Sequence, residues 1–227
     1  VERFPTIAAR LIALANSVWS SPVKPIIALE MACARLGFSV VRSTSIALAV
    51  AAPFDPTPCP TFDAMRFWCH SLLEAETSSW LSQKVPAQEE LPNETARIAG
   101  LLHNLGLLWL VDQLPEELNQ AFLLHQKDPT ITLRTALLDI VGIDYGEAGR
   151  YLAETWELPK PLIVAMSNEA IKERTDDYWQ LTHLINLADC LVSAVGKEIP
   201  CPVSDIRLKA LDIRHEDVGY VLHLIYS

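Results

Sequence analysis

The segment Ala99-Gly100-Leu101-Leu102-His103-Asn104-Leu105-Gly106 lies in the middle of a predicted helix over residues 94–111 that is apolar on nearly all sides. A helix without a polar face is buried all round, so we expect it at the centre of a helical bundle. His103 and Asn104 are the exceptions, and a buried polar group without a partner costs about 1–3 kcal/mol. The two side chains therefore predict either a hydrogen-bonded pair in the core or a metal or phosphate site.

Helical periodicity dominates the rest of the chain, and no alternating run of residues requires a sheet. The sequence predicts an all-α protein of about a dozen helices. The expected helices cover about 7–17, 27–36, 39–52, 61–83, 94–111, 115–126, 133–141, 147–156, 159–172 and 179–195, with two short ones after Ser204 and at about 216–226. Segment 39–52 is ambiguous, because Val40 and Val41 would suit a strand, but its Ala-rich second half favours a helix.

Specific residues mark several boundaries. Gly37 ends the second helix, Asn93 is a good N-cap for helix 94–111, and Asp144 with Glu147 has the spacing of a capping box. Four prolines within segment 53–60 are the clearest interruption in the chain. We therefore place a boundary between two lobes here, with one lobe at 1–60 and the other at 61–227.

The composition limits the classes of function. The chain has 227 residues, of which half are hydrophobic and 20% are charged, and this excludes a disordered protein. Eighteen basic and 28 acidic residues give a net charge of −10, which argues against binding of a nucleic-acid backbone through a positive face. The longest apolar runs reach about half of a membrane span, and no export signal opens the sequence. We expect a cytoplasmic protein without nucleic-acid or membrane binding. Its first residue, Val1, indicates a piece of a longer chain.

The cysteines support the same compartment. The chain has five of them, at positions 33, 59, 69, 190 and 201, and none forms a Cys-x-x-Cys pair. An odd number without metal-site spacing argues against a disulfide framework or a structural zinc site. We expect buried free thiols in a reducing environment.

Two further polar residues lie in apolar helices and could be partners for the central pair. His70 lies in the aromatic-rich segment Phe67-Trp68-Cys69-His70-Ser71, and Asp189 lies in the apolar helix 179–195. On spacing alone, each is more often a hydrogen-bonded core residue or a surface residue than a ligand.

Taken in order, several segments resemble the HDOD (HD-related output domain) family, a branch of the HD superfamily of metal-dependent phosphohydrolases. The matching segments are Ala15-Asn16-Ser17, Ala32 to Gly37, Phe67-Trp68-Cys69-His70-Ser71, Ala99-Gly100-Leu101-Leu102-His103-Asn104-Leu105-Gly106, Tyr151-Leu152-Ala153-Glu154-Thr155-Trp156-Glu157-Leu158-Pro159 and Ala188-Asp189. The fourth is close to the signature Ala-Gly-Leu-Leu-His-Asp-Ile-Gly. The resemblance implies a two-lobed helical bundle, with a small N-terminal lobe packed on an HD-like C-terminal lobe.

The chain departs from the catalytic pattern at the positions that matter for metal chemistry. Catalytic relatives hold one or two metal ions with a first histidine, the His-Asp doublet and a last aspartate, which here correspond to His70, His103-Asn104 and Asp189. Asn104 is neutral and a weaker ligand than the aspartate that it replaces. Leu107 replaces a lysine that often follows the doublet, and Ser167-Asn168 replaces a later His-His pair.

The resemblance therefore implies a vestigial site. His70, His103 and Asp189 could still form a site with two histidines and one carboxylate for a divalent metal such as Fe, Mn or Zn. We expect instead no cofactor and no catalytic residues, because hydrogen bonds alone can satisfy a buried His–Asn pair.

HDOD domains are generally regarded as signalling output modules. The expected function is a non-catalytic regulatory module in bacterial signal transduction that acts through a protein partner, in a longer chain that carries a receiver or other sensor domain. The alternatives are a residual metal-dependent phosphohydrolase of nucleotides or cyclic dinucleotides, and a sensor that binds an effector in the former catalytic cavity.

Overall fold

The computed structural model describes residues 5–16, 22–85, 92–128, 130–167, 178–195 and 205–226, and these residues form helices and no strand. The helices are α1 (Pro5–Ala15), α2 (Leu29–Leu36), α3 (Phe38–Ala51), α4 (Ala64–Ser82), α5 (Asn93–Leu102), α6 (Leu105–Gln113), α7 (Pro115–Lys127), α8 (Leu133–Ile140), α9 (Tyr145–Thr155), α10 (Lys160–Ser167), α11 (Trp179–Val195), α12 (Asp205–Leu211) and α13 (His215–Tyr226). The all-α prediction is confirmed.

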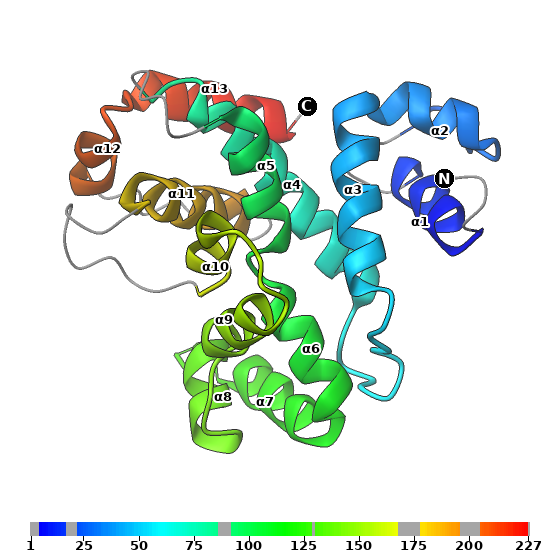
Figure 1. Ribbon diagram of the computed structural model, residues 1–227, viewed down its shortest axis with the longest axis vertical. Helices are drawn as coiled ribbons and strands as arrows, with labels where there is room; N and C mark the ends of the chain where they lie inside the picture. The colour runs from blue at the N-terminus through cyan, green and yellow to red at the C-terminus, as the bar shows by residue number, and fades with distance from the viewer. Residues whose placement is uncertain are drawn as a thin grey trace.

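The helices form two groups of unequal size (Figure 1). Helices α1–α3 lie on one side of α4 and α5, and the remaining helices lie on the other side and below. The two groups share one core cluster, in which Leu36 and Leu48 of the small group lie with Trp68 and Leu102 of the large one. This arrangement agrees with the expected two-lobed bundle, whereas the boundary at residue 60 stays a prediction.

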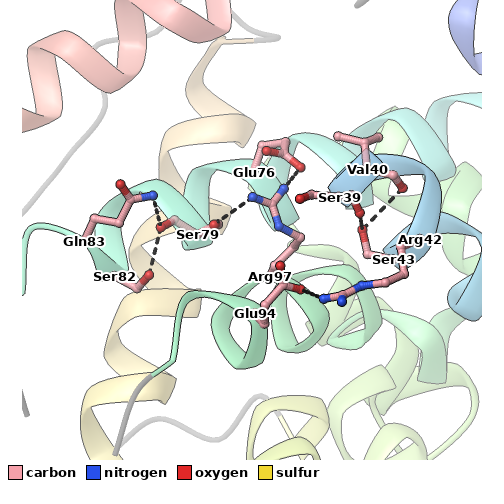
Figure 2. Close-up of polar contacts among 10 residues, drawn as sticks. All are labelled: Ser39, Val40, Arg42, Ser43, Glu76, Ser79, Ser82, Gln83, Glu94 and Arg97. Carbon is pink, nitrogen blue, oxygen red and sulfur yellow. Dashed lines mark hydrogen bonds and ion pairs between the residues drawn. The ribbon is translucent and has the colours of Figure 1, made fainter. Parts of the chain in front are cut away.

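Polar contacts join the two groups where α3 meets α5 (Figure 2). Arg42 of α3 forms an ion pair with Glu94 at the start of α5. One turn further along α5, Arg97 pairs with Glu76 of α4 and donates to Ser79 Oγ at 2.9 Å. The contact between the lobes therefore has an apolar part in the shared core and a charged part in the Arg42–Glu94 ion pair, whereas the Arg97 contacts lie within the large group.

Several local predictions are confirmed. The ambiguous segment 39–52 is helical as α3, and Gly37 separates α2 from α3 with φ of 82°, a value that glycine tolerates best. Asp144 accepts from the backbone N–H groups of Gly146 and Glu147, and Glu147 accepts from the N–H of Asp144, so the capping box is present. The proline-rich segment after α3 packs onto the large group, because Cys59 is 1% exposed and Phe54 stacks on Trp156.

The predicted continuous helix over 94–111 is wrong. It is two helices, α5 and α6, with His103 and Asn104 in a turn between them, and Asn104 adopts φ −97° and ψ 9°. The packing explains this break. Helix α5 contacts α4 and helix α6 contacts α9, and a single straight helix would not make both contacts. Asn93 is also not the N-cap; it is the first residue of α5, and its Oδ1 accepts from Ser82 Oγ at 2.9 Å.

Two further expectations concern the cysteines and the membrane. Cys33, Cys59, Cys69 and Cys190 form no disulfide bond, and Cys201 lies outside the described residues. Cys59 is buried as expected, whereas the other three described cysteines are only partly buried. In the part of the chain that the structure describes, no single helix is long and apolar enough to cross a membrane. Helices α2 and α3 pass that test only as a pair, and they are bent by 112°.

Candidate functional site

Helix α4 brings two titratable side chains to one place. His70 and Glu74 are four residues apart, so they lie on the same face of the helix. The Glu74 carboxyl group is fully buried, while 33% of the His70 side chain is exposed. His70 Nδ1 lies 3.1 Å from Glu74 Oε1. An isolated buried carboxylate is unfavourable by several kcal/mol, so its surroundings must supply compensating partners.

The turn between α5 and α6 supplies two of these partners. His103, which is 1% exposed, places Nδ1 3.3 Å from Glu74 Oε2 and 2.7 Å from the carbonyl oxygen of Gly100. The contact with a carbonyl oxygen requires the proton to be on Nδ1. Asn104 Nδ2 donates to Glu74 Oε2 at 3.5 Å, a long hydrogen bond. The interruption of the predicted helix is thus what turns both side chains toward α4.

Helix α11 brings the second carboxylate. Ligand atoms of Asp189, His70 and Glu74 all lie within 4.8 Å of one another, and Ser193 Oγ donates to Asp189 Oδ1 at 3.4 Å. Burial, and then the negative charge of Asp189, raise the pKa of the hydroxyl group of Tyr145, the first residue of α9. Residues from α4, α11 and the turn between α5 and α6 therefore meet around Glu74.

The electrostatics of this centre favour a proton on Glu74. Burial raises the pKa of Glu74 well above its ordinary value of 4.5. His103 opposes this rise, and the carboxylate of Asp189 adds to it. The net direction is upward because removal of the group from water is the largest effect.

This rise predicts a pH-dependent stability. The folded protein holds a proton on Glu74 that the unfolded chain releases above about pH 4.5, so the free energy of unfolding falls as the pH rises from there through the raised pKa. The slope from this one group is at most about 1.4 kcal/mol per pH unit. In urea unfolding between pH 5 and 8, Glu74→Gln should gain stability relative to the wild type as the pH rises. A difference between the two proteins that is constant across this range would contradict the prediction.

The structure brings together all four residues of the predicted vestigial site, namely His70, His103, Asn104 and Asp189. Each lies close to Glu74, which was not among the residues predicted from the sequence. A signal was present, since Glu74 is one helical turn after His70 in a stretch of small and apolar residues. Ser167 of α10 is buried, and its hydroxyl donates to the carbonyl oxygen of Val164, whereas Asn168 lies outside the described residues.

The donor atoms are close enough to hold a cation, but their chemistry does not fit one well. His70, Glu74 and Asp189 would be the ligands, and His103 is not part of this group. A metal ion needs lone pairs, yet Asn104 turns an N–H group toward Glu74, and the raised pKa favours the neutral form of the Glu74 carboxyl. The site differs in this respect from the set of His70, His103 and Asp189 that the sequence indicated.

Comparisons with known proteins bear on the family and the fold. A sequence profile of the HDOD domain matches residues 1–171. No curated protein matches the chain. The fold is similar to that of a provisionally named signal transduction protein of Marinobacter aquaeolei VT8, with a TM-score of 0.70 and 20% identity over the whole chain, which spans 54% of that protein. The chain thus covers about half of the length of this relative.

Two other solved structures are similar. One is a provisionally named phosphohydrolase of Shewanella amazonensis SB2B, with a TM-score of 0.67, 22% identity, and coverage of 99% of this chain and 79% of the other. The other is the response regulator MmoQ of Methylococcus capsulatus, with a TM-score of 0.61, 20% identity, and coverage of 96% and 85%. At these identities the likeness concerns the fold alone.

Proposed function

Because the chain belongs to the HDOD domain family, we propose that it is a regulatory signalling module that acts through contacts with a protein partner and does not hydrolyse phosphate esters. The observation that carries this proposal is the side chain at position 104. Asn104 stands where the resemblance places the doublet's aspartate, and its amide donates toward Glu74. The response regulator among proteins of similar fold supports the signalling role.

An amide at this position removes what metal-dependent hydrolysis requires. A carboxylate at position 104 would be anionic and could bridge two cations, whereas the amide of Asn104 is neutral and offers one weak carbonyl ligand. Without the metal, the site loses the means to generate hydroxide near neutral pH. The proposal therefore includes the absence of a bound divalent ion.

The surface that serves the partner in this proposal lies on the N-terminal lobe. Four side chains in segment 23–38 are strongly exposed although they are apolar: Val23 is 100% exposed, Ile27 86%, Met31 58% and Phe38 80%. Contiguous exposed apolar patches are typical of interaction sites, and these four side chains lie within 16 residues of one another in the chain. The segment covers α2 and the first residue of α3.

The charge distribution indicates the chemistry of the partner. Residues 1–60 carry five basic and three acidic residues, a net charge of +2, whereas residues 61–227 carry 13 and 25, a net charge of −12. Exposed Lys24 and Arg35 lie among the apolar side chains of this segment, together with one exposed acidic residue, Glu30. We propose a protein partner that presents apolar side chains together with acidic ones, since opposite charges favour and orient such an encounter.

Charge substitutions in this segment test the proposal. Ile27→Glu and Phe38→Glu should each lower the affinity for the partner by at least about tenfold, because a buried charge would face an apolar surface. Leu123→Glu is the matched control, since Leu123 is 49% exposed on α7 of the other lobe. The measurement is quantitative capture from a lysate of the source organism on immobilised protein, after circular dichroism has confirmed folding.

A protein that the wild type and Leu123→Glu retain and the two other variants lose would support the proposal. Equal capture by all four proteins would contradict it. Turnover of a cyclic dinucleotide by the wild type would favour the phosphohydrolase instead, and a specific nucleic-acid complex tighter than about 10⁻⁶ M would overturn the choice of a protein partner.

A further inference from the structure

The carboxyl group of Glu74 lies where the four polar side chains of the site meet. Its Oε1 is 3.1 Å from His70 Nδ1, and its Oε2 is 3.3 Å from His103 Nδ1 and 3.5 Å from Asn104 Nδ2. The carboxylate of Asp189 is the remaining neighbour. Glu74 thus contacts every residue that the resemblance would assign to a metal ion.

The nitrogen atoms of Asn104 and His103 that face Glu74 both carry hydrogen atoms. Asn104 donates an N–H to Oε2, and the Nδ1–H of His103 donates to the carbonyl oxygen of Gly100, so neither nitrogen offers a lone pair to a cation. Asp189 brings a second carboxyl group beside Glu74, and this like-charge contact adds to the rise of the Glu74 pKa. Proton-bearing nitrogens of this kind stabilise a carboxyl group and repel a cation.

The packing of α5 on α4 fixes this arrangement. A Cβ atom at Gly100 would lie 2.9 Å from the backbone oxygen of Glu74 and 2.7 Å from Ser78 Oγ, so the two helices approach closely only because position 100 is glycine. This approach places His103 and Asn104, three and four residues later, beside the Glu74 side chain. The carboxyl group is therefore held from two helices and has no access to solvent.

We propose that the Glu74 carboxyl group occupies the centre of this site in place of a divalent ion and closes it against metal binding. This inference rests on the proposed function and gives it a cause within the chain itself. Two residues then keep the site free of metal: Asn104, which lacks a ligand carboxylate, and Glu74, which fills the space. Neither change alone should restore binding.

The test compares the wild type, Asn104→Asp, Glu74→Ala and the double variant Glu74→Ala/Asn104→Asp, with Mn²⁺ chloride as the probe. The readouts are Mn²⁺ per chain after desalting and the shift of the melting temperature with added Mn²⁺. The double variant should bind one Mn²⁺ per chain, at least about tenfold more tightly than Asn104→Asp. The wild type and Glu74→Ala should bind none.

Two control variants distinguish the effect of the volume of the Glu74 side chain from the effect of its carboxyl group. Glu74→Gln/Asn104→Asp removes the ionisable carboxyl group but keeps the volume, so it should bind no better than Asn104→Asp alone. Glu154→Ala/Asn104→Asp removes an exposed glutamate of α9 and should also match Asn104→Asp. If Glu74→Ala does not fold, Glu74→Ser opens the same space and keeps a hydroxyl group near His103.

The outcomes are distinct. A folded double variant that binds Mn²⁺ no better than Asn104→Asp would overturn the inference. Stoichiometric Mn²⁺ in the wild type that is lost in Glu74→Ala would also overturn it, because Glu74 would then be a ligand. The proposed function is judged separately, by capture of the partner and by phosphodiester turnover, neither of which uses the Glu74 and Asn104 variants.

Discussion

Replacing Gly106 by alanine is expected to lower the free energy of unfolding by at least about 3 kcal/mol. A Cβ atom at this position would lie 2.1 Å from the carbonyl oxygen of Tyr145 and 2.3 Å from the backbone nitrogen of Gly149. These are backbone atoms of α9, so no side chain can rotate away, and α6 and α9 would have to separate. Overpacking costs about 1–3 kcal/mol where side chains can adjust, and more where they cannot.

Helix propensity works in the opposite direction and gives the control. Alanine is favoured over glycine inside a helix by about 0.5–1 kcal/mol. Gly219 lies in α13, and a Cβ atom added there would meet no other atom within 4 Å, so Gly219→Ala should raise the stability by about that amount. Urea unfolding of both variants measures the difference. Equal stability of Gly106→Ala and Gly219→Ala would mean that α6 and α9 are not in direct backbone contact.

The second large effect is expected for His103→Ala, which should destabilise the protein by about 2–4 kcal/mol. The change opens a cavity at a residue that is 1% exposed, and it removes the donor to the Gly100 carbonyl oxygen. It also removes the neighbour that opposes the rise of the Glu74 pKa. Both losses occur in the core, where water does not replace the missing contacts.

Urea melts of His103→Ala, with His215→Ala as the control, test this prediction. His215 is exposed at the start of α13, and its replacement should change stability by less than about 0.5 kcal/mol. An unchanged midpoint for His103→Ala would mean that the turn between α5 and α6 is not part of the core. A loss of similar size in both variants would argue against a special role of the buried histidine.

Much of the fold could be predicted from local patterns. The all-α class follows from apolar periodicity, because the spacing of apolar residues reports which face of each helix is buried. The capping box at Asp144 and the glycine at position 37 are also local, since their partners lie within three or four residues. The segments that indicate the family are local in the same sense, and the profile match over residues 1–171 confirms what they implied.

The site was predictable only in part. His70, His103, Asn104 and Asp189 could be selected because they are polar residues in apolar helices, and the resemblance grouped them. The helix interruption at His103–Asn104 was not predictable from periodicity, because the pattern of apolar residues continues through it without a glycine or proline at the break. It follows from α5 packing on α4 while α6 packs on α9.

By itself, then, the sequence determined the all-α class, the family and the asparagine at position 104 where the resemblance places an aspartate, because each depends on neighbours in the chain or on the identity of one residue. Only the tertiary structure decided the place of Glu74. A glutamate in a helix is normally exposed, and this one is buried because α5, the turn after it and α11 surround it with groups from residues 100–104 and 189. Burial and partners are properties of the packed helices, so the charge, the pKa and the role of Glu74 exist only once the chain has folded around it.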